Sequence, residues 1–255
     1  MNYIFDGTYN GFLCCVFEYF EYKDTDVQLQ VEGDNATQTT LFGLSKNIIT
    51  DLAKAKRVQT GLQKRLEKSV AMDFFRVFLS EDRKAWVASF SIICQIFSGK
   101  TNILQNYGDE EVLYFKQTLK KVSRERHRMK AFIRFSKSSD GLFFAIAEPD
   151  FNVLPLITTF FKNRYTDQKW LIYDVKRKYG LLYDKQTVME VKLSPEEKYG
   201  LTTDAVITLD EEDEHFQNLW KRYYQSTNIE ARRNMKLHLQ YVPKRYWKYL
   251  VEKQI

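Results

Sequence analysis

The spacing of apolar residues changes near residue 130, and this change constrains the fold more than any other feature of the sequence. Before it, apolar side chains recur every three or four residues, which is typical of helices that bury one face. Two stripes show this spacing: Leu62, Leu66, Val70, Phe74 and Phe78, then Trp86, Phe90, Ile93 and Phe97, with Gly99 at a C-cap position. We predict a mostly helical first half, with further helices over residues 9–22 and 109–126 and a short strand over residues 2–5.

After residue 130 the apolar residues alternate or form short continuous runs, which is typical of strands. We expect strands over residues 131–135, 142–147, 170–173, 179–183 and 188–191, and helices over residues 152–165, 194–197, 216–223 and 244–252. The fold predicted is α+β, with a small, mainly antiparallel central sheet and helical regions before and after it in sequence. Since no flexible linker interrupts the chain, we interpret residues 1–255 as one domain with sub-regions 1–128 (mostly helical), 129–193 (sheet-rich) and 194–255 (helical and basic).

The cysteines and the lengths of the apolar stretches bear on where in the cell the protein is located. No apolar run reaches the roughly 20 residues that a membrane helix needs, and no basic segment precedes the first run as in a secretory signal. Cys14, Cys15 and Cys94 form an odd set, which argues against a disulfide framework. We therefore predict a cytoplasmic protein with reduced thiols and no membrane contact.

Charge is segregated along the chain, whose net charge is +6. Residues 1–36 hold seven acidic residues and one basic residue, whereas residues 116–137 hold nine basic residues and one acidic residue. Residues 219–255 hold nine basic and two acidic residues, interleaved with aromatic side chains. Basic patches bind phosphate backbones by releasing counterions, and exposed rings can stack on bases. The alternatives are an acidic partner protein, or basic side chains that extend to solvent beside a packed aromatic core.

The basic stretches supply the candidate nucleic-acid-binding residues. Phosphate contacts by Arg and Lys would give affinity with little sequence choice, and Tyr246 or Trp247 would stack on an unpaired base. The candidates are Arg124, Arg126, Arg128, Arg134, Arg177, Arg232, Arg233, Lys244, Arg245 and Trp247.

Two groups of residues are weak catalytic candidates. Glu125 and His127 would share a face on a strand but not on a helix, and they could form an acid–base pair. The alternative, which we favour slightly, is a solvated basic helix end with Glu125 in an ion pair. Asp150 after Pro149, followed by Asp174 and Lys176, matches a metal-dependent nuclease pattern in which two carboxylates bind Mg²⁺ and a lysine stabilises charge.

Other signals of chemistry are few. Glu190-Val191-Lys192 is a second match to the end of the nuclease pattern, and Asp6-Gly7-Thr8 follows the first strand, where Asp6 could bind a ligand or cap a helix. The short pattern also arises by chance, and a predicted helix separates its two halves. No metal site and no cofactor are predicted.

Six segments in order resemble a bacterial family known only as probable DNA-metabolism proteins, the domain-of-unknown-function family 4130. They are YIFDGTYNGFLCCVF (3–17), RERHRMKAFIRF (124–135), EPDFNVL (148–154), IYDVKR (172–177), WKRYYQSTNIEARRN (220–234) and PKRYWKYL (243–250). The resemblance implies partners: a uracil-DNA-glycosylase-like protein and a radical S-adenosylmethionine (radical SAM) protein acting in DNA modification or repair. It implies no established catalytic activity.

The residues and the resemblance together lead to one main functional hypothesis. The chain is expected to be a DNA-metabolism or repair accessory protein that binds DNA, or a DNA-bound repair enzyme, through its basic and aromatic faces. One alternative is an enzyme that acts on DNA, such as a metal-dependent nuclease. The other is a protein-interaction subunit without DNA contact of its own.

Overall fold

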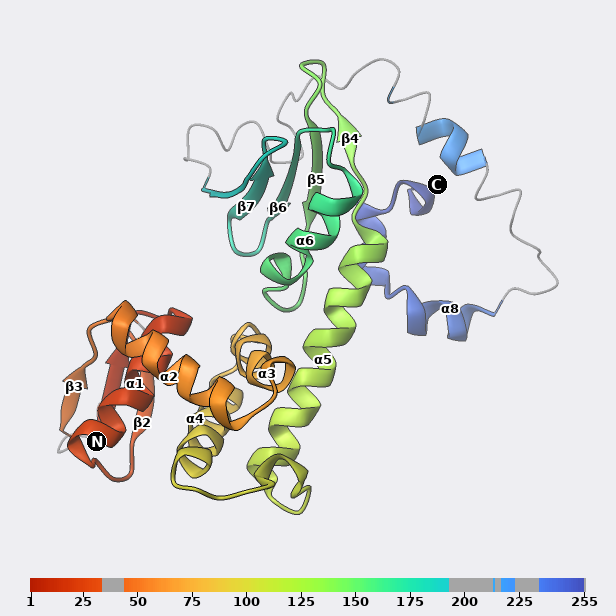
Figure 1. The fold of residues 1–255 in the computed structure, drawn as a ribbon. Helices are drawn as coiled ribbons and strands as arrows, with labels where there is room; N and C mark the ends of the chain where they lie inside the picture. The colour runs from red at the N-terminus through yellow and green to blue at the C-terminus, as the bar shows by residue number, and fades with distance from the viewer. Residues whose placement is uncertain (34–43, 193–212, 214–216, 223–233, 255) are drawn as a thin grey trace. The chain divides into compact units, whose positions relative to one another are not determined.

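The computed structural model describes residues 1–33, 44–192, 213, 217–222 and 234–254. They form two compact units, residues 1–123 (unit 1) and residues 124–255 (unit 2), each with its own sheet (Figure 1). The boundary between the units falls within the long helix α5 (Glu110–Phe132).

Unit 1 contains a three-stranded parallel sheet. Its central strand β1 (Asn2–Phe5) pairs with β2 (Gln28–Val31) on one side and β3 (Ser45–Asn47) on the other. Helix α1 (Tyr9–Tyr22) follows β1 and has the bounds that the sequence predicts. It packs beside α2 (Leu52–Arg65). The prediction of a single, mainly antiparallel sheet is therefore wrong for this half, because the polar segment after α1 contributes a parallel strand.

The turn after β1 settles the role of Asp6. Thr8, and not Asp6, caps α1, because its hydroxyl oxygen accepts from the Gly11 N–H at 3.0 Å. Asp6 accepts from the backbone N–H and hydroxyl of Thr8 and from the Thr50 hydroxyl, at 2.8–2.9 Å. Its carboxylate thus ties the end of β1 to the segment before α2.

The rest of unit 1 is helical around an aromatic core. The first predicted stripe is divided between two helices, because α2 ends at Arg65 and α3 (Lys68–Phe78) begins after a short break. Helix α4 (Arg83–Phe97) and the 3-10 turn η1 (Ile103–Gln105) follow, and Gly99 adopts φ +89° after α4. Phe78 stacks on Trp86 and lies against Tyr9 and Phe12.

Helix α5 is longer than the sequence predicts. The strand expected over residues 131–135 is wrong, because the buried positions keep helical spacing up to Ile133: Val122, Glu125, Met129 and Ile133. The charged Glu125 occupies one of these positions, which hides the period from a count of apolar residues. The only strand here is β4 (Ser136–Lys137).

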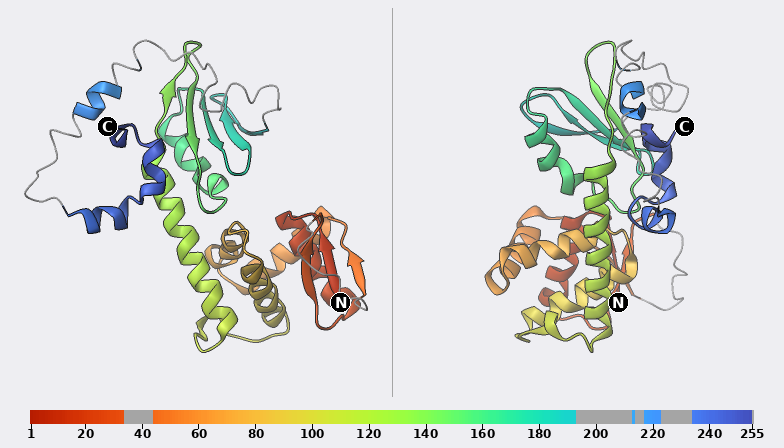
Figure 2. Two further views of the ribbon diagram at one scale, coloured as in Figure 1. Left: turned by 180° about the vertical axis from the view of Figure 1, so that it is seen from behind. Right: turned by 90° about the vertical axis from the view of Figure 1, so that its right-hand side faces the viewer.

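Unit 2 contains a five-stranded mixed sheet in the order β4-β5-β6-β7-β8. Strands β5 (Phe143–Ala147) and β6 (Trp170–Asp174) are parallel and are connected by α6 (Leu154–Arg164), which lies against one face of the sheet (Figure 2). Strands β7 (Tyr179–Tyr183) and β8 (Val188–Val191) continue it antiparallel. A parallel pair needs a crossover connection of about a dozen residues or more, and the segment that contains α6 supplies it.

The C-terminal part of unit 2 consists of short elements. They are α8 (Met235–Tyr241) and two 3-10 segments, η4 (Lys244–Tyr249) and η5 (Val251–Lys253), where the sequence predicts one helix. The helix predicted at residues 194–197 lies outside the described residues. Of the helix predicted at residues 216–223, residues 217–222 are described, and they are helical. In the described part of the chain, no helix has the length and apolar character needed to cross a bilayer.

Candidate functional site

The parallel pairing of β5 and β6 brings the two halves of the nuclease-like pattern to one edge of the sheet. Ala147, the last residue of β5, lies opposite Asp174, the last residue of β6. Asp150 and Lys176 therefore follow adjacent strand ends, and the Lys176 ammonium donates to the Asp150 carbonyl oxygen at 3.2 Å. The carboxyl end of parallel strands is a frequent position for ligand sites in α/β proteins. The second match does not join them, since Glu190 lies on the edge strand β8 opposite Leu181.

The two aspartates of the pattern each pair with an arginine. Asp174 is fully buried and accepts from the Arg177 guanidinium at 2.8 Å and from the Arg177 backbone N–H at 3.1 Å. Asp150 pairs with Arg245 at 2.5 Å. Among the residues that the structure describes, no three His, Cys, Asp or Glu side chains group closely enough to hold a metal ion.

A buried carboxylate from α5 holds the site together. Glu125, only 1% exposed, accepts from the Asp150 backbone N–H at 2.9 Å and from the Tyr246 hydroxyl at 2.6 Å. Arg245 lies 3.7 Å from the same carboxylate and donates to the Tyr246 oxygen at 2.7 Å. We call Glu125, Asp150, Arg245 and Tyr246 the Glu125 cluster. Burial, followed by the hydrogen bond to Glu125, raises the pKa of the Tyr246 phenol, so the hydroxyl stays a donor.

The structure does not bring Glu125 and His127 together. The segment is helical, so the two side chains leave α5 on different faces, and His127 is exposed whereas Glu125 is buried. Glu125 is paired, as the alternative hypothesis expects, with Arg128 at 3.8 Å and Arg245 at 3.7 Å. The expectation of a solvated helix end is wrong, because Glu125 is buried and α5 continues to Phe132.

A basic pocket of about 370 Å³ opens beside the Glu125 cluster. Both acidic residues that line it are already paired: Asp150 with Arg245, and Glu148 with Lys248 at 2.5 Å. Tyr249 also donates to Glu148, at 2.7 Å. The lining consists of Glu148, Pro149, Asp150, Lys176, Lys244, Arg245 and Lys248. Four basic side chains against two acidic ones leave a positive surplus in the pocket.

Lys244 and Lys176 carry this surplus. Lys244 is exposed, and Lys176 donates to the Asp150 carbonyl oxygen. Within the described part of the chain, Lys244 forms no hydrogen bond or ion pair, and Lys176 forms none other than this one. Arg245 is 44% exposed and is held in place by Asp150, Glu125 and Tyr246. The arrangement presents exposed ammonium groups beside one oriented guanidinium, which suits an anion such as phosphate.

The other predicted nucleic-acid-binding residues differ in their exposure and in whether they already form ion pairs. Arg124 is exposed and Arg126 is half-buried, whereas Arg128 and Arg134 are engaged with Glu125 and Glu252. Arg177 is only 9% exposed and also donates to the Pro149 and Asp150 carbonyl oxygens. Its guanidinium thus holds the two strand ends together. Arg232 and Arg233 lie outside the described residues.

The expectation that Tyr246 stacks on a base is wrong, because its ring is 1% exposed and packs on Phe132. Trp247 is half-buried, donates to the Val242 carbonyl oxygen at 3.0 Å, and packs beside His238 and Lys253. The aromatic residues of η4 therefore anchor this segment. Its basic residues, which alternate with them, face solvent.

Sequence reasoning did not single out Glu148 and Lys248 as site residues. Glu148 immediately follows a predicted strand and directly precedes the Pro149-Asp150 match. This position at a strand end could have identified Glu148 as a candidate site residue. Nothing in the sequence places Lys248 next to it, because the two residues meet only through the fold.

Glu252 anchors the end of the segment that carries the pocket lysines. It accepts from Arg134 at 2.9 Å and from the Trp220 indole at 3.0 Å. Burial alone would raise the pKa of Glu252. The hydrogen bond and positive charge of Arg134, together with hydrogen bonds from the backbone and from Trp220, outweigh burial, so the pKa lies below its usual value. A lowered folded-state pKa means that this carboxylate stabilises the fold above its unfolded pKa and loses that effect as pH falls.

We therefore expect Glu252→Gln to lower the free energy of unfolding by about 1–2 kcal/mol near neutral pH. The difference from wild type should shrink as pH falls through about 4.3 and below, where the unfolded and then the folded carboxyl becomes protonated. Urea unfolding of both proteins over this pH range measures it. A stability difference that stays constant with pH would contradict this role of Glu252.

The fold and pocket define an α+β protein whose second unit carries a basic pocket at the carboxyl end of a parallel strand pair. Residues 83–252 match the family model described as domain of unknown function DUF4130, and the chain belongs to this family. No curated protein and no solved structure matches the chain significantly.

Proposed function

We propose that this protein binds DNA through its sugar–phosphate backbone, with the basic pocket as the central phosphate site. The observation that carries the proposal is the surplus of positive charge in the pocket after Asp150 and Glu148 are paired. Lysines without a carboxylate partner gain most from a phosphate, since they give up no existing ion pair. Arg245 is already oriented, so less conformational entropy is lost when it binds.

The choice of DNA rests on the resemblance to DNA-metabolism proteins. Three of the segments that carry it, residues 148–154, 172–177 and 243–250, contribute all seven residues of the pocket lining. A fourth, residues 124–135, contributes Glu125, which holds the pocket in place. The resemblance and the pocket geometry thus fall on the same residues. Such contacts position a protein on DNA without reading its sequence.

The cellular setting is part of the same proposal. All three cysteines are free and buried, which fits a reducing cytoplasm. A uracil-DNA-glycosylase-like protein or a radical SAM protein would act on the bound DNA, and this protein would serve as their accessory.

The double substitution Lys176→Glu/Lys244→Glu tests the proposal. Reversing two unpaired charges in the pocket should weaken DNA binding at least about tenfold at low salt, because two phosphate contacts become repulsive. The slope of log affinity against log salt should become shallower by about two for duplex DNA. Fluorescence anisotropy with single-stranded, duplex and uracil-containing oligonucleotides over a salt series measures both effects.

The matched control is Lys68→Glu/Lys100→Glu, which makes the same change in net charge at exposed lysines of unit 1. It should change affinity much less than the pocket variant. Equal losses in both variants would mean that net charge, and not the pocket, governs binding. No binding of wild type at low salt would overturn the proposal and favour a subunit that contacts only proteins.

A further inference from the structure

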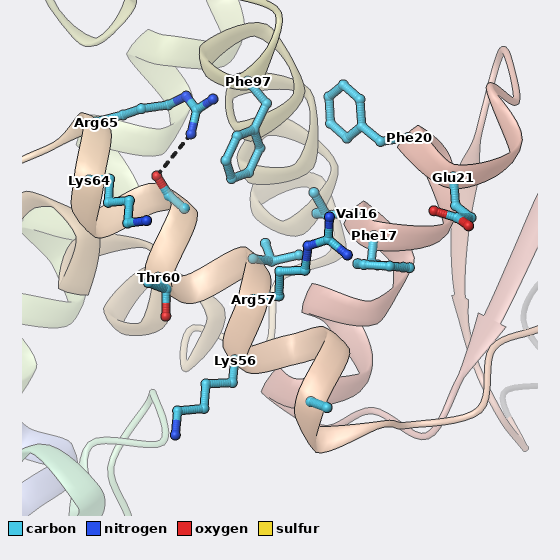
Figure 3. A pocket seen from close by; sticks show the side chains of 13 residues that line it. Val16, Phe17, Phe20, Glu21, Lys56, Arg57, Thr60, Lys64, Arg65 and Phe97 are labelled. Atoms are coloured by element: carbon cyan, nitrogen blue, oxygen red, sulfur yellow. Dashed lines mark hydrogen bonds between the residues drawn. The ribbon is translucent and has the colours of Figure 1, made fainter.

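A second cavity is lined only by residues of unit 1, and it shares no residue with the proposed DNA site. It is an open groove of about 740 Å³ that is lined by residues of α1 and α2 and by Phe97 of α4 (Figure 3). We call it the unit 1 groove. Its volume is in the range of ligand-binding clefts, and its open form suits an elongated ligand.

The floor of the unit 1 groove is apolar. Phe17 and Phe20 come from α1 and Phe97 from α4, and Phe20 meets Phe97 edge-on with ring centroids 5.8 Å apart. Phe20 remains 39% exposed although it belongs to a packed cluster. Gly61 lets the Phe97 ring pack closely against α2, since a Cβ atom there would lie 2.8 Å from the ring. The floor is therefore formed by residues already packed in the folded unit.

One rim of the groove is strongly basic. Helix α2 contains five basic residues and no acidic residue within Leu52–Arg65. Four of the five line the groove: Lys56, Arg57, Lys64 and Arg65. The two pairs are eight residues apart, which is about 12 Å along a helix. The opposite rim carries one charged residue, Glu21 of α1.

Two of the four basic side chains on the rim, Arg57 and Arg65, pack on aromatic rings of the floor. The Arg57 guanidinium lies over the Phe17 ring at 5.5 Å, and that of Arg65 lies over Phe97 at 4.8 Å while donating to the Gly61 carbonyl oxygen. Lys56 and Lys64 are exposed and form no hydrogen bond or ion pair within the described part of the chain. The groove thus offers an apolar strip beside a row of cations that have no carboxylate partner among the described residues.

These features suit a helix better than a nucleobase. Bases bind by stacking on ring faces and by hydrogen bonds to their edges. Here Arg57 and Lys54 lie over Phe17, Arg65 lies over Phe97, and the uncharged polar lining is limited to Thr60. An amphipathic helix needs only an apolar floor for its ridge of i, i+3/i+4 and i+7 side chains. Acidic side chains two turns apart on its flank would reach the two basic pairs.

We propose that the unit 1 groove docks an amphipathic helix of a partner protein, with acidic side chains along the flank that faces α2. The apolar ridge of the partner fills the strip over Phe17, Phe20 and Phe97. Its carboxylates pair with Lys56, Arg57, Lys64 and Arg65. Charge complementarity sets the orientation of the partner, because only the α2 rim is basic.

A display selection of random peptides of about 16 residues, roughly four helical turns, on the full-length protein tests this proposal. We expect the selected peptides to combine apolar residues at i, i+3/i+4 and i+7 with Asp or Glu on one flank. Selected peptides that are basic or lack an apolar ridge, or an absence of enrichment over uncoated support, would overturn it.

Variants then locate the binding of a selected peptide. Lys56→Glu/Lys64→Glu should weaken binding at least about tenfold in anisotropy, and more salt should weaken binding to wild type. Lys120→Glu/Lys121→Glu, an equal charge change on the exposed face of α5 in the same unit, should have little effect. Equal losses in both variants would place the peptide elsewhere.

The DNA assay separates this proposal from the proposed function. Lys56→Glu/Lys64→Glu should keep DNA affinity, and Lys176→Glu/Lys244→Glu should keep peptide affinity, because the two sites share no residue. A loss of DNA binding in the groove variant without loss of peptide binding would assign the groove to nucleic acid and overturn the helix proposal.

Discussion

Replacing Glu125 by alanine is expected to lower the free energy of unfolding of unit 2 by about 3 kcal/mol or more. The substitution leaves the Asp150 backbone N–H and the Tyr246 hydroxyl without their acceptor. It also removes the negative charge that faces Arg128 and Arg245. The charge term is the smaller part, because the Arg245 side chain is 44% exposed and water can replace its partner. Urea unfolding followed by tryptophan fluorescence measures the loss, since Trp170, Trp220 and Trp247 all lie in unit 2.

A double-mutant cycle with Tyr246→Phe shows whether the cluster acts as a unit. Tyr246→Phe alone removes the hydrogen bond that the hydroxyl donates to Glu125 and the one that it accepts from Arg245, and it should cost about 1.5–3 kcal/mol. The double variant should cost clearly less than the sum, because both substitutions break the same contact. Additive effects, or a loss under about 1 kcal/mol for Glu125→Ala, would show that the cluster does not hold η4 against α5.

Replacing Asp174 by alanine is expected to destabilise unit 2 by about 3–5 kcal/mol, because it leaves a buried arginine without its counter-charge. Asp174 is fully buried and Arg177 is 9% exposed, so water cannot replace the lost partner. Arg177 also spans the ends of β5 and β6 through the Pro149 and Asp150 carbonyl oxygens. The same urea unfolding measures the effect, and we expect loss of the basic pocket with it.

Asp150→Asn is the matched control and also separates a structural role from a catalytic one. The Asp150 carboxylate is 44% exposed and pairs with an equally exposed arginine, so its removal should cost only about 0.2–1 kcal/mol. The nuclease hypothesis makes the opposite prediction for stability. If both substitutions leave stability unchanged or raise it, and Mg²⁺ stabilises the wild type alone, the two aspartates are metal ligands and the structural role of Asp174 is refuted.

Local patterns in the sequence predict most of the elements. Strand β1 and helix α1 have the predicted bounds, as do β7 and β8. Each of these elements is defined by the spacing of its own side chains. The prediction of a strand over residues 131–135 is wrong because it also relied on the spacing of apolar residues. Glu125 occupies a buried position of the helix although it is charged, so this spacing did not reveal that α5 continues. The parallel sheet of unit 1 was missed because its partners for β1 are polar and lie far along the chain.

The candidate site divides in the same way. The sequence indicates a basic C-terminal segment and a Pro-Asp and Asp-x-Lys pair, and the β5–β6 pairing does bring Asp150 and Lys176 together. The sequence does not show which basic residues are exposed and lack a carboxylate partner, and can therefore bind an anion. The sequence also did not predict the basic rim of α2, because five basic residues in one helix are not unusual in a chain with 39 lysines and arginines.

The sequence by itself determined the α+β class, the segregation of charge and the positions of most helices and strands, because each depends on neighbours within a few residues. Only the tertiary structure decided which cations remain free. Arg134 meets Glu252 across 118 positions, and Glu125 meets Tyr246 across 121. Opposite charges pair wherever the fold brings them within about 4 Å, and burial strengthens those pairs. Which lysines lack a carboxylate partner within the described residues, as Lys244 and Lys176 do, is therefore a property of the folded chain.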